Sequence, residues 1–338
     1  MTHRVSARPL PERPTVVVLR ALPGLGDWLC AVPTLRALRA ARPQAAIHVV
    51  ALEPNRELLG RYPELIDGFH PFPGWPGLPE RRPDVRALPA FLAEIQSLDA
   101  DLAIQLHGAG DLTNEIVELF AARAVAGFYR PGERCPDPAR FLRWREDDQE
   151  VRRGLRLLAL LGMPVEDDGL SFPLDPRARS RTTRLLADAG VTGPYVVVHA
   201  GSNRPAARWA PERFAEVAAS LAAAGRHIVL TGGLGERELT GHLAARIPGA
   251  ADVGGRTDLD TLGWLLRGAD LLISNDTGVS HLAAALRVRS VVVFPDGSEA
   301  HRRRWAPLDG ERHRAVPPSV PRVVAEASRQ LRSLERAS

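Results

Sequence analysis

Short apolar runs rich in valine, isoleucine and leucine, each followed by a helical pattern, are the feature that most constrains how this chain folds. The runs are apolar on both faces, which is typical of parallel strands that are covered by helices on each side. Their alternation with helices predicts open α/β sheets. The first predicted helix follows the turn after the first strand and ends at about residue 42. Further helices are predicted over about 211–224, 236–246 and 279–286. The predicted strands are residues 15–19, 47–52, 102–106, 195–199, 227–231, 271–274 and 290–294.

The strands fall into two series, which are separated by residues 163–176, a segment containing prolines and aspartates. A single core rarely grows past about 250–300 residues, so a chain of 338 residues is expected to form two domains. We predict doubly wound domains over 14–170 and 177–318, and a C-terminal helix within 319–338 that packs back on the body. Ligands of such sheets bind outside the carboxyl ends of the strands, so the loops at those ends are the candidate sites.

Composition and charge narrow the classes of partner. All 44 basic residues are arginine, and acidic residues interspersed with them leave a net charge of +4. A nucleic-acid-binding protein more often gathers its basic residues on one face, so nucleic acid is not the expected partner. Residues 1–13 lack the apolar core of a signal peptide, and no run reaches about 18 apolar residues. We therefore expect a cytoplasmic protein with at most peripheral membrane contact. The two cysteines, Cys30 and Cys135, have no metal-binding spacing and are predicted to be buried thiols.

A glycine-rich turn, LPGLGDW, directly follows the first predicted strand. Gly24 and Gly26 allow a tight turn and the close approach of a ligand to the backbone. Asp27 lies at the predicted start of a helix. Its simplest role there is to cap the helix, and the functional alternative is to act as a general base toward a hydroxyl. The turn also resembles a dinucleotide-binding fingerprint with Glu53 as the ribose-binding acid, but Leu29 occupies the place of the third glycine.

Two loops of the second series carry groups that suit a nucleotide. The sequence HAGS ends at Ser202, and Arg208 stands just before a predicted helix. Backbone amides, a hydroxyl, a fixed cation and a helix N-terminus together suit a diphosphate, whereas the alternative is a turn with a helix-capping segment. The sequence TGGLGE ends at Glu236. This carboxylate can accept hydrogen bonds from both hydroxyls of a ribose, or it can simply complement the dipole of the helix that follows.

The sequence SNDTGVSHLAAA is the most specific motif, because it follows a buried strand and opens a helix of small residues. Asp276, Thr277 and the backbone amides from Gly278 onward are expected to converge on one spot that binds an anion and sugar hydroxyls. His281 lies one turn into the helix and faces back toward the same loop. A lone histidine at such a place is usually structural, but its combination with DTG favours a role toward a ligand.

Two further segments keep more than one interpretation. Residues 71–89 contain six prolines and form a predicted loop that either lines an acceptor site or is a plain surface excursion. The sequence FPDG and the later Trp305 are predicted to close the donor site, and the arginines at 302–304 form either a solvated face, which is the favoured interpretation, or a phosphate clamp.

Taken in order, the GD, HxGS, RWxPE, GGxxE and DTGxxHLAAA motifs resemble glycosyltransferase family 9, the ADP-heptose–lipopolysaccharide heptosyltransferases, over nearly the whole chain. The resemblance implies a GT-B fold of two Rossmann-like domains facing a central cleft, the first for the acceptor and the second for the donor. It implies inverting transfer that needs no metal and no cofactor. It makes Asp27 the general base, with Gly24 and Gly26 in the acceptor loop. The implied donor-binding residues are Ser202 and Arg208 at the diphosphate, Glu236 at the ribose, Thr257 near the base, and Asp276, Thr277, Gly278 and His281 at the sugar-diphosphate end.

The chain departs from the family at Arg208, where lysine is usual. Arginine keeps the charge but binds phosphate with a different geometry, and the segment between Ser202 and Arg208 is long. The first domain carries no pattern that matches a lipopolysaccharide core, so that core, another surface glycan, a lipid-linked glycan and a small natural product are all candidate acceptors. ADP-heptose is the leading donor. The alternatives are a transferase that uses a UDP- or GDP-hexose, a non-catalytic nucleotide-sugar-binding protein, and an NAD(P)-dependent oxidoreductase.

Overall fold

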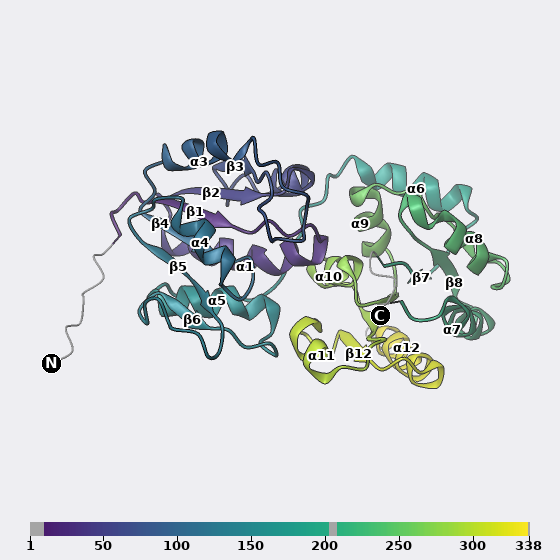
Figure 1. Ribbon diagram of the computed structural model, residues 1–338. Coiled ribbons are helices and arrows are strands. Elements are labelled where there is room, and N and C mark those ends of the chain that lie inside the picture. The colour runs from purple at the N-terminus through teal and green to yellow at the C-terminus, as the bar shows by residue number, and fades with distance from the viewer. Residues whose placement is uncertain (1–9, 203–207, 337–338) are drawn as a thin grey trace. The chain divides into compact units, whose positions relative to one another are not determined.

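A computed structural model describes residues 10–202 and 208–336 of the chain. The chain divides into two compact units, Met1–Asp168 and Gly169–Ser338 (Figure 1). The boundary between the units falls inside the segment 163–176, which forms neither helix nor strand. Each unit is built on its own parallel sheet, so the two predicted strand series belong to separate sheets.

The first unit holds a parallel sheet with the strand order β3-β2-β1-β4-β5-β6. Because β1 continues to β2 on one side and β4 lies on the other, the connections change direction between β1 and β4. The strands are β1 Thr15–Leu19, β2 Ala46–Ala51, β3 Gly68–Pro71, β4 Leu102–Gln105, β5 Val125–Tyr129 and β6 Phe141–Arg143. The helices are α1 Leu25–Ala41, η1 Glu53–Asn55, α2 Arg56–Leu59, α3 Leu88–Gln96, α4 Leu112–Glu118 and α5 Glu150–Leu160.

Helices cover both faces of this sheet, as the two-sided apolar strands predict. Val17 and Leu19 of β1 pack against Phe91 of α3 and Ile116 of α4 on one face. Val18, which points to the other face, is only 1% exposed, and α1 packs beside α5. The burial of successive residues of β1 explains why the sequence shows a continuous apolar run there instead of an alternating one.

The second unit repeats the arrangement with the strand order β12-β11-β10-β7-β8-β9, so its connections change direction between β7 and β10. The strands are β7 Tyr195–His199, β8 His227–Leu230, β9 Ala251–Asp252, β10 Leu271–Asn275, β11 Ser290–Val293 and β12 His313–Val316. The helices are α6 Ala178–Asp188, α7 Pro211–Ala223, η3 Leu234–Glu236, α8 Arg237–Ala244, α9 Leu259–Arg267, α10 Gly278–Ala285, α11 Glu299–Trp305 and α12 Val320–Glu335.

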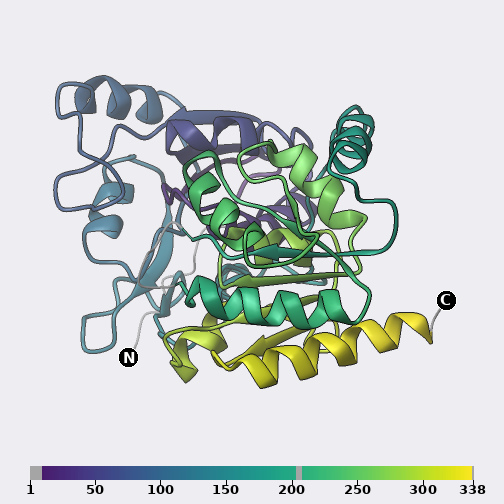
Figure 2. The ribbon, with the colours of Figure 1, turned by 90° about the vertical axis from the view of Figure 1, so that its right-hand side faces the viewer.

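The last helix, α12, belongs to the second unit's core. Its apolar residues Val323, Ala327 and Leu331 join the same buried cluster as Phe214 and Val217 of α7. Figure 2 shows this helix, in yellow, running beside α7. The amphipathic pattern at the end of the sequence therefore serves burial against this unit.

The prediction of two doubly wound parallel sheets is confirmed, and each predicted run matches a strand to within one residue at either end. Five strands were not predicted, namely β3, β5, β6, β9 and β12. These strands are partly exposed or contain glycine, so they lack the continuous apolar run that marks a central strand.

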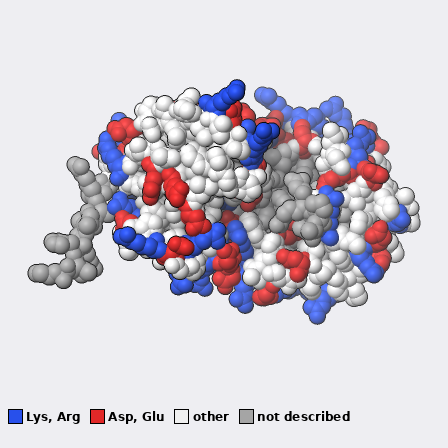
Figure 3. Space-filling view, viewed as in Figure 1, with Lys and Arg blue, Asp and Glu red and all other residues white. Residues whose placement is uncertain are grey.

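The surface agrees with the even spread of charge along the sequence. Figure 3 shows acidic and basic side chains interspersed on the face that it presents. Within residues 10–202 and 208–336, no helix is both long and apolar enough to cross a bilayer.

His313 on β12 leads to a prediction about pH and stability. Burial lowers the pKa of His313 from its ordinary value of 6.5 to about 4, and the ring lies 2.9 Å from Ser290 Oγ. Between these pH values the unfolded chain binds a proton that the folded chain does not, so the free energy of unfolding falls as the pH drops. Replacing His313 with glutamine should remove about 2–3 kcal/mol of the loss between pH 7 and pH 4.5, measured by urea denaturation. The exposed His242, changed to glutamine, is the control, and an equal loss in both variants would contradict the assignment.

Candidate functional site

A buried asparagine joins the two loops at the switch point of the second sheet. Asn275, at the end of β10, is fully buried. Its Nδ2 donates to the carbonyl of Ala200 at 2.8 Å, and its Oδ1 accepts from the backbone N–H of Trp209 at 2.9 Å. The loop after β7 is therefore held at both ends beside the turn that follows β10. The sequence reading assigned Asn275 no role, although a polar residue that closes a wholly buried strand was a usable signal.

The loop after β7 brings the predicted diphosphate-binding residues together. The Nε and Nη2 of Arg208 donate to the carbonyl of Ser202 at 2.9 and 2.6 Å. The same Nη2 lies 4.0 Å from Glu236 Oε1. Arg208 keeps 38% of its side chain exposed, so the guanidinium is accessible from solvent. The long segment between Ser202 and Arg208, residues 203–207, lies outside the described residues.

Glu236 lies at the end of η3, directly beside the loop after β7. Its Oε2 accepts from the backbone N–H of Gly233 at 2.8 Å, and 16% of the side chain is exposed. A Cβ at Gly201 would collide with this carboxylate, so a side chain there would force Glu236 to move. The carboxylate thus organises its own loop, while Oε1 faces Arg208. Whether it also binds a ribose stays a prediction.

His199 is buried between these two loops. Its Nδ1 lies 3.1 Å from Thr231 Oγ1. Burial lowers the pKa of His199, although the nearby charge of Glu236 acts in the opposite direction. The imidazole is therefore neutral at pH 7, and it supports the loops by packing and by the contact with Thr231.

Thr257 is the outlying member of the predicted set. It is half-buried in the loop between β9 and α9, next to Asp258, whose Oδ1 accepts from the backbone N–H of Thr261 at 2.7 Å. The loop is tied to its neighbour because Gly255 N–H donates to the carbonyl of Gly232 at 2.9 Å. Thr257 thus lies at the same edge of the sheet as Glu236, one strand further out.

The turn after β10 has the features of an anion site. Thr277 is the N-cap of α10 and Gly278 is its first residue, so the N–H groups of Gly278 and Val279 have no carbonyl partner inside the helix, whereas that of Ser280 donates to the carbonyl of Thr277 at 3.0 Å. The hydroxyl oxygen of Thr277 is buried; it faces the backbone N–H of Ser280 in a capping-box arrangement but makes no hydrogen bond of good geometry within the described part of the chain. A buried polar atom of this kind calls for a partner such as a ligand or a water molecule. The predicted convergence of Thr277 and Gly278 on one spot agrees with this geometry.

Asp276 faces two imidazoles. Its Oδ2 lies 2.9 Å from Nε2 of His301, and its Oδ1 lies 3.8 Å from Nε2 of the predicted residue His281. Asp276 and His281 are almost fully buried, with 7% and 5% of their side chains exposed. His301 comes from α11 and was not among the predicted site residues, because nothing near it in the sequence marks a partner.

The arginines at 302–304 fit the interpretation as a solvated face. Arg302 pairs with Glu299 of the same helix, and Nε of Arg303 lies 3.2 Å from Glu299 Oε1. The guanidinium of Arg304 lies over the ring of Trp305, 4.8 Å from its centroid.

In the first unit, Asp27 lies in the first turn of α1, at the carboxyl edge of the sheet. It is half-buried, and Gly26 before it is buried. A Cβ at Gly24 would collide with Oδ2 of Asp27, so the carboxylate folds back over the residue that precedes the helix. A side chain at position 24 would thus force the carboxylate of Asp27 to move, and the role of Asp27 as a base stays a prediction.

Arg20 holds this first turn in place. Its Nε and Nη2 donate to the backbone carbonyl of Asp27 at 3.0 and 2.6 Å, and its Nη1 donates to the carbonyl of Leu106 at 2.8 Å. Glu150, 3.3 Å from Nη2, balances the buried charge and also pairs with Arg153. Breaking such a pair leaves an uncompensated buried charge, so these residues stabilise the start of α1. The sequence reading missed them.

The proline-rich loop reaches the same edge of the first sheet. His107, directly after β4, accepts from the N–H of Ala21 through Nδ1 at 2.9 Å, so its proton is on Nε2. That nitrogen lies 3.1 Å from Oε1 of Glu80, which belongs to the loop. Burial alone raises the pKa of Glu80, but the interaction with His107 outweighs burial and lowers the pKa overall. The pair anchors the predicted acceptor loop close to the turn that leads to Asp27.

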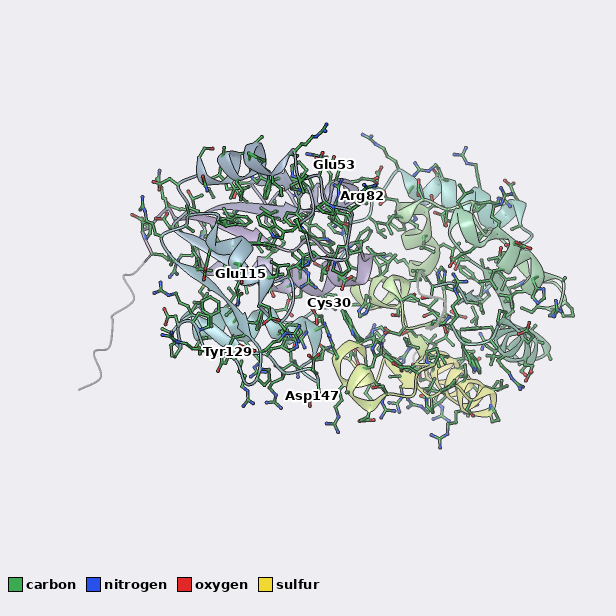
Figure 4. The ribbon with its side chains drawn as sticks, viewed as in Figure 1. Cys30, Glu53, Arg82, Glu115, Tyr129 and Asp147 are labelled. Atoms are coloured by element: carbon green, nitrogen blue, oxygen red, sulfur yellow. The ribbon has the colours of Figure 1, made fainter. Side chains whose placement is uncertain are left out.

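Two residues marked in Figure 4 bear on the remaining expectations. Glu53, after β2, forms a two-pronged ion pair with Arg56, with distances of 2.6 and 2.9 Å. This pairing gives its carboxylate a local role and weakens the dinucleotide-binding alternative. Cys30 is buried in α1, as predicted, but the prediction of a buried thiol is wrong for Cys135, which is half-buried in a loop beside Phe141.

Comparison with known proteins settles the family. The model of glycosyltransferase family 9, described as heptosyltransferase, matches residues 91–316. This chain belongs to glycosyltransferase family 9. The prediction of a glycosyltransferase, made from the order of the motifs, is thereby confirmed.

Two relatives of this family-9 chain carry names that describe their substrates. Lipopolysaccharide heptosyltransferase 1 of Pseudomonas aeruginosa is 31% identical over 212 residues, which are 60% of this chain and 57% of that protein. Lipopolysaccharide heptosyltransferase 3 of Escherichia coli is 25% identical over 300 residues, 83% of this chain and 84% of that protein. The first alignment thus spans little more than half of its relative.

Solved structures confirm the fold. The family-9 glycosyltransferase of Veillonella parvula has a TM-score of 0.79 at 21% identity, covering 97% of this chain and all of that one. The E. coli heptosyltransferase WaaC, solved with ADP-2-deoxy-2-fluoro heptose, has a TM-score of 0.65 at 20% identity, covering 96% of this chain and all of that one. The two Rossmann-like domains of this family-9 chain are those of the GT-B fold.

The contacts of Asn275 predict a large loss of stability when they are removed. Leucine at this position keeps the volume but leaves the carbonyl of Ala200 and the N–H of Trp209 buried without partners. We expect the free energy of unfolding in urea to fall by about 2–4 kcal/mol. Glu238→Leu on the exposed surface of α8 is the control, with an expected change of about 0.5 kcal/mol or less. Equal stability of the two variants would show that Asn275 does not hold the loop.

Proposed function

We propose that this chain transfers a heptose, or a related sugar, from an ADP-sugar to an acceptor hydroxyl by single displacement with inversion and without a metal ion. The observation that carries the proposal is the anion site at the switch point of the second sheet. There Asn275 holds the loop of Arg208 beside the first turn of α10. A fixed cation and the first backbone N–H groups of a helix at one place are what a departing nucleoside diphosphate requires.

The chemistry of the leaving group supports transfer without a metal. When the glycosidic bond breaks, negative charge grows on the oxygen of the diphosphate that departs. Arg208 and the N–H groups at the start of α10 are preorganised donors for that charge. The positive end of the helix dipole stabilises the same charge. Thr277 Oγ1, which is buried and makes no hydrogen bond of good geometry among the described residues, offers a further hydrogen bond to the donor.

In the first unit, Asp27 is the proposed base. It lies at the start of α1, where the contact between Arg20 and its backbone carbonyl fixes the turn. A carboxylate in this role removes the proton of the acceptor hydroxyl as that oxygen attacks the sugar. Attack on the face opposite the leaving group inverts the configuration, and one base is enough for it.

The names of the relatives favour ADP-heptose as the donor and lipopolysaccharide as the acceptor. The anchored proline-rich loop, held by Glu80 and His107, is the proposed wall of the acceptor site. A different surface glycan or a small natural product fits the same geometry. A UDP- or GDP-hexose donor is the second candidate, since the groups proposed to bind the diphosphate do not distinguish the bases.

Calorimetric titration with ADP, UDP and GDP in the presence of EDTA tests the nucleotide and the need for a metal. We expect ADP to bind at least about tenfold more tightly than the other two, which corresponds to about 1.4 kcal/mol. The Arg208→Gln variant should weaken the binding of ADP, because a neutral amide replaces the fixed cation. Preference for UDP or GDP would exclude the ADP-sugar donor, and failure of all three to bind would contradict a nucleotide-sugar site.

Asp27→Asn tests the base and the non-catalytic alternative together. The amide cannot accept the proton, so kcat should fall by about 10²–10⁴-fold. The affinity for ADP should stay unchanged, because the proposed donor contacts lie in the second unit. Transfer is measured as release of the nucleoside diphosphate in the presence of acceptor, with Glu118→Gln on the exposed surface of α4 as the matched change from carboxylate to amide. Undiminished turnover in Asp27→Asn would rule out this mechanism.

A further inference from the structure

The carboxylate of Asp276 poses an electrostatic problem at the proposed donor site. Asp276 lies directly before Thr277 and Gly278, at the N-terminal end of α10, where the diphosphate is proposed to bind. Only 7% of its side chain is exposed, so solvent does little to screen its charge. An unbalanced buried carboxylate is unfavourable in itself and would repel an approaching anion.

The structure places one imidazole at each oxygen of this carboxylate. Nε2 of His301 lies 2.9 Å from Oδ2, and Nε2 of His281 lies 3.8 Å from Oδ1. The shorter of the two contacts is therefore the one to His301. His301 belongs to α11, the helix that ends at Trp305, a residue that the sequence predicted to close the donor site.

Aromatic rings fix the orientation of His301. Its ring packs against Phe294 at a centroid distance of 5.9 Å and against Trp305 at 6.5 Å. Trp305 also meets the ring of His281 at 6.0 Å and an interplanar angle of 73°. One side chain of α11 thus packs against both imidazoles. Asp296, with Oδ2 3.8 Å from Nδ1 of His301, is a second carboxylate facing the ring.

We propose that His301 is a positioning residue for the donor, which holds Asp276 through its Nε2–H and offsets the carboxylate's charge so that a diphosphate can approach the amides of α10. This rests on the proposed function of that site. His301 acts through Asp276 and need not touch the donor itself. Its removal takes away the hydrogen-bond donor at Oδ2 and, among the described residues, leaves His281 beside Asp276 at the longer distance.

A pair of substitutions separates the hydrogen bond from the packing. His301→Phe keeps a ring between Phe294 and Trp305 but has no donor for Asp276. His301→Gln supplies an amide N–H near the position of Nε2. We expect the Kd for ADP, measured by calorimetry, to rise about tenfold or more in His301→Phe, and His301→Gln to recover most of the affinity. His242→Phe is the matched control. His242 is on α8, where its Nε2 lies 3.4 Å from Oε1 of Glu212 on α7, away from Asp276.

A double variant tests the charge directly. Asp276→Asn removes the negative charge that His301 is proposed to offset. His301→Phe combined with Asp276→Asn should therefore bind ADP more tightly than His301→Phe alone, a strong departure from additivity. If His301 had only a structural role, the two substitutions would add and His301→Gln would be as weak as His301→Phe. Should His301→Phe not fold, His301→Asn replaces it, because its shorter amide does not reach Asp276.

The outcomes separate this inference from the proposed function. If the wild-type chain binds ADP but His301→Phe binds it equally well, the inference is overturned and the proposed function stands. If the wild-type chain binds none of ADP, UDP and GDP, the proposed function fails and the inference falls with it. Weaker binding in His301→Phe, recovered in His301→Gln and in the double variant, supports both.

Discussion

The buried amide of Asn275 is the interaction on which the candidate donor site depends. In a doubly wound sheet the connections on the two sides of the switch point run in opposite directions, which leaves the loops there without a shared hydrogen-bond ladder. Asn275 joins them by bonding Ala200 and Trp209 at once. Because the side chain is fully buried, neither bond can be replaced by water, and the positions of Ser202 and Arg208 follow from it.

The first unit solves the same problem with a charged group. Arg20 follows β1 and bonds the carbonyl of Leu106 after β4, so it too spans the switch point of its sheet. A buried guanidinium needs a counter-charge, which Glu150 supplies. The difference has a consequence for chemistry, because Arg20 fixes Asp27 through its backbone carbonyl and thereby sets where the first turn of α1 begins.

Charge balance is the second constraint on the donor site. Asp276 and Glu236 both lie at the carboxyl edge of the second sheet, where an anionic ligand is proposed to bind. Each faces nitrogen groups, since Asp276 meets His301 and Glu236 meets Arg208 and a backbone N–H. Both carboxylates are thus held by neighbouring nitrogen groups. In the proposed site they can accept hydrogen bonds from sugar hydroxyls without repelling the phosphates.

The sequence by itself determined the central strands, the glycine-rich turns that follow them and the order of the motifs, because apolar periodicity and the freedom of glycine are local properties. It did not reveal the short edge strands, whose burial is only partial. Only the tertiary structure decided that Arg20 meets Glu150, that Asn275 meets Ala200, and that His301 meets Asp276. These partners are 25 to 130 positions apart, so no local pattern links them, and the folding of each sheet alone brings them within hydrogen-bond distance.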